Sequence, residues 1–254
     1  MKRMRTFAVC LVAVCAASAV VATTASASAP EIGRCIKVAA KTGKYSSATC
    51  TTAKAGGSYE WLPGAEKKKF TTKGGIGILE TAGGTAVGCK TETSGGEFNT
   101  PKTVTGIVVT FKECESAGLK CKTKETGEGE LVTKELEGEL GIESKKIVNG
   151  KETIKLALDL FPAGKTGLFI EFSCGPLSVK VQGSVLVNVL DDKMESALTL
   201  KYSAKHAKQK PEGFEGLPKD ILESSINGHP FEQSGQTITT VQTGEEKLEA
   251  NAFV

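Results

Sequence analysis

The sequence has 254 residues, a charged fraction of 24% and a net charge of +3 at pH 7. Lys2, Arg3 and Arg5 account for the whole excess, and beyond them the only arginine is Arg34, among scattered lysines and glutamates. Sequence-specific nucleic-acid binding favours clustered arginines and stacking aromatics, so this composition excludes nucleic acid as an expected partner. The mixed Lys/Glu surface is that of a soluble protein.

The first 27 residues have the pattern of a secretory signal peptide. An apolar stretch from Phe7 to Ala22 follows the positive start, and the small residues at 25–27 form an Ala-x-Ala cleavage site. A membrane anchor would need a longer apolar span without a small-residue exit, so we expect no membrane span after cleavage. The sequence predicts a mature chain that begins at Ser28 and is secreted, or associated with the cell wall.

Six cysteines follow the signal: Cys35, Cys50, Cys89, Cys114, Cys121 and Cys174. An even number in an oxidising compartment predicts three disulfides. The short spacings favour local bonds, the first between Cys35 and Cys50. A second would join Cys114 to Cys121. Elimination then pairs Cys89 with Cys174. Because the chain has no Cys-x-x-Cys motif and only two histidines, we expect neither a metal nor a cofactor.

Residues 28–69 are expected to form a small N-terminal module with its own disulfide. This segment holds most of an aromatic cluster, Tyr45, Tyr59, Trp61 and Phe70. Tyr59 and Trp61 are two residues apart, so on a strand they share one face and could stack on a sugar ring. Core packing is the other interpretation of a single tryptophan, and an exposed or a buried Trp61 distinguishes the two.

Residues 70–254 are expected to form an antiparallel β domain, because their apolar residues alternate with polar ones. The clearest alternation runs from Leu177 to Leu190, with Gly183 as a candidate bulge, and another runs from Ile154 to Leu160. Val104 to Phe111 is apolar on both faces, which indicates a central strand. Glycine-rich turns between these segments favour an all-β sandwich or barrel over any helical fold.

Turn signals include Asn149-Gly150 and Asn227-Gly228. The second could end a helix from Pro218 to Asn227, but Ser224, Ser225 and Ile226 favour a hairpin there. The polar segment from Lys205 to Gly216 has neither period and is predicted to be an irregular surface crossing.

Two groups of residues could support a secreted hydrolase. Glu135, Glu137 and Glu139 alternate with small or apolar residues and would line one face of a strand, either as an acid/base or calcium site or as a solvated face. His206 and His229 are the only histidines and could serve as general bases. We expect both to be solvated loop residues, and no catalytic residue is assigned.

Several stretches resemble a group of predicted exported, cysteine-containing β proteins of Gram-positive soil bacteria. They include GRCIKVAAKTGKYSSATC, YEWLPG, ILETAGGTAVGCKTET, LDLFPAGKTGLFIEFSCG and GFEGLPKDILESSINGHPFEQSGQT. The resemblance implies export and stabilisation by disulfides, and it assigns no activity or ligand. We therefore expect a secreted, non-catalytic β protein with a binding or structural role toward an extracellular or cell-wall ligand.

Overall fold

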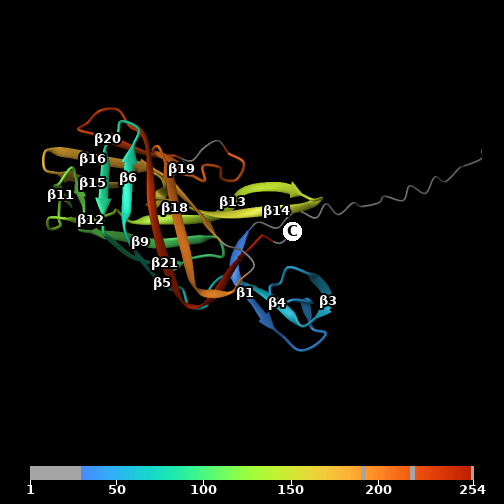
Figure 1. Cartoon of the computed structure of the whole chain (residues 1–254). Helices are drawn as coiled ribbons and strands as arrows, with labels where there is room; N and C mark the ends of the chain where they lie inside the picture. The colour runs from blue at the N-terminus through green and yellow to red at the C-terminus, as the bar shows by residue number, and fades with distance from the viewer. Residues whose placement is uncertain (1–29, 190–192, 218–220, 253–254) are drawn as a thin grey trace, which may run out of the picture.

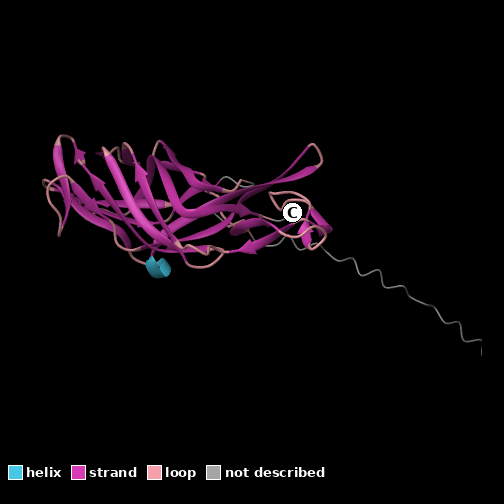
Figure 2. Ribbon diagram, turned by 90° about the horizontal axis from the view of Figure 1, so that it is seen from below, coloured by secondary structure: helices cyan, strands magenta, loops and turns pink. Residues whose placement is uncertain are grey.

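The structure is a computed structural model, and it describes residues 30–189, 193–217 and 221–252. The expected signal peptide, residues 1–27, and the new N-terminus at Ser28 lie outside these residues. As predicted, the fold is nearly all β (Figure 2). The only helical piece in the described segments is a single 3-10 turn, η1 (Ala163–Lys165).

Eight antiparallel strands close into a barrel by pairing from β6 round to β21 and back to β6. These strands are β6 (Gly77–Thr81), β7 (Ala86–Cys89), β10 (Glu115–Ser116), β11 (Leu119–Thr123), β15 (Leu168–Cys174), β16 (Leu177–Gly183), β20 (Leu222–Ile226) and β21 (Glu232–Asn251). Closure leaves these strands without free edges, which is one way that β proteins avoid pairing with other chains.

A second sheet extends the barrel at one end, in the order β18–β21–β5–β8–β9–β13–β14–β17, with β12 also paired to β9. Its strands are β5 (Lys69–Gly74), β8 (Thr91–Phe98), β9 (Thr103–Lys112), β12 (Glu130–Val132), β13 (Leu136–Val148), β14 (Lys151–Pro162), β17 (Val185–Val189) and β18 (Glu195–Lys205). Only one or two residues separate β5 from β6, β7 from β8 and β16 from β17. The barrel and the second sheet therefore share one interior, and one hydrophobic core contains residues of both.

The predicted alternation is confirmed along several strands. In β14 the side chains of Ile154, Leu156 and Leu158 are all buried, as are Val179 and Val181 in β16. β9 pairs on both sides, so the expected central strand is also correct.

Leu186, which departs from the alternation, is buried on the opposite face against Ala157 and Phe214. The polar crossing is more regular than predicted, since its β19 (Lys208–Lys210) pairs with β18.

Both asparagine–glycine turns form as predicted. Asn149 and Gly150 have φ values of 52° and 75° and connect β13 to β14, a hairpin that extends away from the barrel (Figure 1). β20 and β21 pair across Asn227-Gly228, so the hairpin and not the helix is correct for the described residues 221–227. Residues 218–220, at the start of that segment, lie outside the description.

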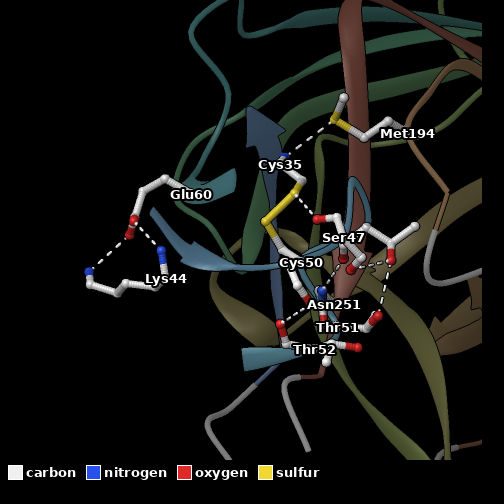
Figure 3. The surroundings of a disulfide bond; sticks show 11 residues. Cys35, Lys44, Ser47, Cys50, Thr51, Thr52, Glu60, Met194 and Asn251 are labelled. Atoms are coloured by element: carbon white, nitrogen blue, oxygen red, sulfur yellow. Dashed lines mark hydrogen bonds and ion pairs between the residues drawn. A yellow bond between two sulfur atoms is a disulfide. The ribbon is translucent and has the colours of Figure 1, made fainter. Parts of the chain in front are cut away.

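The N-terminal residues form a small sheet of β1 (Glu31–Lys37), β2 (Gly43–Tyr45), β3 (Ala53–Gly57) and β4 (Tyr59–Pro63). β1 also pairs with the last residues of β21, from Glu31 opposite Asn251 to Gly33 opposite Glu249. The predicted Cys35–Cys50 disulfide is present, and Figure 3 shows its surroundings, with the backbone N–H of Cys35 donating to the Met194 sulfur at 3.3 Å. Phe70 lies outside this sheet and packs on Phe98 in the main core.

The other two predicted disulfide pairings are wrong. Cys89 bonds to Cys114, and Cys121 bonds to Cys174. The turn after Cys114 does bring it beside Cys121, whose backbone N–H donates to the Cys114 carbonyl at 3.0 Å. Each side chain nevertheless bonds to the strand on its other side, because Cys121 lies directly opposite Cys174 in the β11–β15 ladder. Cys121 thus has two cysteines beside it, Cys114 and Cys174, and the prediction from short sequence spacing chose the wrong one.

Candidate functional site: a polar group in the barrel interior

The two histidines do not form a catalytic group in the described part of the chain. His206 and His229 are both exposed, and each lies in a turn next to a strand end. Neither imidazole hydrogen-bonds to a serine or a carboxylate among the described residues. A Ser/His/Asp triad would also need an aspartate, and of the four in the chain Asp191, Asp192 and Asp220 lie outside the described residues.

Glu137 and Glu139 lie on β13 and are half-buried, and Glu135 directly precedes that strand and is exposed. Leu136, Gly138 and Leu140 are buried between the glutamates, which confirms the predicted alternation. Glu139 forms an ion pair with Lys165 at 2.9 Å, and this contact raises the pKa of the Lys165 ammonium group. No cluster of three or more metal-ligating side chains occurs among the residues the structure covers.

Tyr59 and Trp61 share a face of β4 as expected, but that face is packed. Trp61 is 9% exposed, and its indole N–H donates to Glu31 at 3.1 Å. Tyr45, Tyr59 and the Cys35–Cys50 disulfide pack around it. A buried ring cannot stack on a sugar, so the arrangement required for a carbohydrate platform is missing at Trp61.

A cavity of about 150 Å³ lies in the shared interior of the barrel and the second sheet. Most of its wall is apolar, with side chains such as Leu79, Val87 and Ile107, and further leucine, valine and phenylalanine residues from nine other strands. Native cores leave few voids larger than a water molecule, and an apolar cavity of about this volume in another protein accommodates benzene. The interior is therefore large enough for a small organic molecule.

Glu92 gives this cavity its one buried carboxyl group among the lining residues. It occupies an inward position on β8 and is only 4% exposed. Its Oε2 atom has no hydrogen-bond partner in the structure, and neither does Oγ1 of Thr240, which lines the same cavity and is also 4% exposed. Buried polar atoms are almost always hydrogen-bonded, so each of these two atoms can accept a hydrogen bond from a molecule in the cavity.

The backbone explains how a glutamate fits here. Gly74 lies between Glu92 and Thr240 in the sheet, paired with both. A Cβ atom at position 74 would lie 2.8 Å from Oε2 of Glu92 and 2.9 Å from Cγ2 of Thr240. The missing side chain at Gly74 thus leaves the space that the carboxyl group occupies and brings it next to Thr240.

Burial controls the ionisation of this site. Desolvation raises the pKa of Glu92, and a hydrogen bond from Ser94 opposes that shift. Tyr202, a buried neighbour on β18, has its phenol pKa raised by burial and secondarily by the charge of Glu92. Both effects disfavour a negative charge in the cavity unless a cation or a strong donor is added.

A pH titration of stability tests this description. Because the folded-state pKa of Glu92 is raised, the folded protein holds a proton that the unfolded chain releases. The free energy of unfolding should therefore fall as pH rises from the unfolded pKa, about 4.3, to the raised folded value, and level off above it. We expect Glu92→Gln to lack this decrease in urea unfolding measured across that range.

The control is Glu97→Gln, which removes an exposed charge from the same strand. A Glu92→Gln variant whose stability follows the wild-type pH curve, as the control should, would contradict burial of an ionisable carboxyl group at this position.

No family model, no curated protein and no solved structure matches the chain. No helix in the described segments is long and apolar enough to cross a membrane. Glu92 could not be identified from the sequence, because TETSGGEF lacks apolar alternation and looks like a solvated strand. The nearest signal was the pair of glycines at 74 and 75, whose effect depends on strand pairing.

Proposed function

We propose that the protein is exported with removal of its signal peptide and acts outside the cytoplasm, without catalysis, by binding a small and largely apolar molecule in its interior. The observation that carries the proposal is the apolar cavity of about 150 Å³ containing the unpartnered oxygen of Glu92. Three disulfides suit an oxidising compartment, where such bonds persist.

The cavity favours binding over catalysis. Hydrolysis would need a nucleophile or an activated water beside a base, whereas the cavity wall offers one carboxyl group among mostly apolar side chains. Ligand sites in proteins are typically apolar with a few polar groups that orient the ligand, which is the composition found here.

Binding can be tested with toluene as an apolar probe on the oxidised protein starting at Ser28. We expect saturable shifts of amide signals from the lining strands in NMR spectra. Val87→Phe places a larger side chain in the cavity wall and should weaken toluene binding by at least about tenfold. Val241→Phe is the matched control, since Val241 lies on β21 with 43% of its surface exposed.

Equal toluene affinity in Val87→Phe and Val241→Phe would place the binding elsewhere on the protein. Failure of toluene and similar small apolar probes to bind the wild-type protein would refute a ligand site in the interior. For export, mass spectrometry of the protein recovered from culture medium should give a chain that starts at Ser28.

A further inference from the structure

The side chains of Glu92 and Thr240, each with an unpartnered oxygen, meet at one corner of the cavity. Glu92 Oε2 and Thr240 Cγ2 both lie within 3 Å of the same point above Gly74. Both unsatisfied atoms are hydrogen-bond acceptors when Glu92 is ionised. A single donor group with several protons, placed at this corner, could therefore satisfy both.

The protein itself supplies no cation there. The residues that line the cavity include no lysine, arginine or histidine. Tyr202 is the only other lining side chain that titrates, because Cys89 is held in a disulfide. A buried carboxylate without a positive partner is costly, and one that gains a charged donor within a dry site is strongly stabilised.

We infer that the ligand of this cavity is a small amine, whose ammonium group pairs with the Glu92 carboxylate while its apolar part fills the space lined by Leu79, Val87 and Ile107. An ammonium group has three donors, enough for Glu92, Thr240 and one further oxygen. A carboxylate ligand would place a second negative charge beside the ionised Glu92 and is disfavoured. This inference rests on the proposed function, since it specifies the ligand of the same cavity.

The test compares three probes that share a phenyl ring and differ in their polar end: benzylamine, toluene and benzoate. Calorimetry at neutral pH should show benzylamine binding at least about tenfold more tightly than toluene, a ratio that corresponds to about 1.4 kcal/mol. Benzoate should bind more weakly than toluene. Glu92→Gln should reduce the benzylamine-to-toluene affinity ratio to about one, whereas Glu97→Gln should keep the wild-type ratio.

Thr240→Val provides a second variant if Glu92→Gln does not fold. It removes the other acceptor at nearly constant volume and should lower the benzylamine-to-toluene ratio as well. The two variants act on opposite walls of one corner, β8 and β21. A lowered ratio in either supports the pairing, and a wild-type ratio in every folded variant overturns it.

The three probes distinguish a failure of the amine inference from a failure of the interior ligand site. Toluene binding without a preference for benzylamine would leave the apolar site in place and overturn the amine, with an ordered water then satisfying Glu92. A preference for benzoate would mean that Glu92 stays protonated and donates to an acid, which also overturns it. If none of the three probes binds, the interior ligand site itself is refuted.

Discussion

Replacing Cys121 and Cys174 together by alanine is expected to lower the free energy of unfolding by about 4 kcal/mol. The bond spans 53 residues of sequence, the longest separation of the three disulfides, so its loss frees the most entropy in the unfolded chain. Both cysteines are fully buried, and the alanines leave unfilled space in the core as well. Urea unfolding of the double variant and of the wild-type protein measures the difference.

The location of this disulfide adds to its importance. The barrel closes through β10, which pairs with β11 by two residues and with β7 by one. The Cys89–Cys114 and Cys121–Cys174 bonds flank this segment and link its neighbours covalently. Where the ladder has the fewest hydrogen bonds, the two disulfides hold the ring closed.

The control is the double variant Cys35→Ala/Cys50→Ala, whose bond spans 15 residues within the N-terminal sheet. The loop model assigns it about 3 kcal/mol, and the cavity should still bind toluene. A Cys121/Cys174 variant that loses less than about 1 kcal/mol would contradict the role of that bond. Trypsin cleaves after Lys120 and so places Cys114 and Cys121 in different peptides. A digest of the non-reduced protein therefore shows directly whether Cys121 is joined to Cys174.

Gly183→Ala is expected to destabilise the protein by about 2 to 5 kcal/mol. Gly183 ends β16 with φ at +95°, a conformation that side chains with a Cβ rarely adopt. The added Cβ would also overlap the Ile221 carbonyl oxygen unless the backbone moved. The substitution therefore combines backbone strain with a clash between neighbouring strands, at the junction of the barrel and the second sheet.

Gly228→Ala is the matched control because it has φ at +76° in an exposed turn and no atom within 4 Å of the new Cβ. Its free energy of unfolding should fall by only about 1 to 2 kcal/mol, the cost of a left-handed backbone conformation for alanine. Comparable unfolding free energies for the two variants would show that the strand contact at Gly183 relaxes without appreciable energy.

The strand pattern was predictable because it depends on local periodicity. The alternating spacing predicts the buried face of Ile154, Leu156 and Leu158, and the Asn149-Gly150 pair predicts the hairpin that it forms. Gly183 was recognised as an interruption, and the structure shows a break between β16 and β17 at that point. Each of these features involves residues close together in the chain.

Features that depend on distant pairing were not predictable. The partner of Cys121 is set by the register of β11 against β15, which no spacing reveals. Glu92 becomes a buried group because Gly74 lies beside it across the sheet, and Thr240 approaches from the other end of the chain. The candidate site is formed by three strands, β5, β8 and β21, that are distant in sequence. The residues next to Glu92 in the chain therefore do not predict it.

β21 runs through every part of the fold. Its first residues pair with β20 and β6 in the barrel, its middle with β18 and β5 in the second sheet, and its end with β1. A nascent chain that stops before Glu232 therefore cannot close the barrel, form the Glu92 corner or fix β1 in place. Because β21 contributes to the barrel, the second sheet and the pairing of β1, folding cannot be completed before this strand is synthesised.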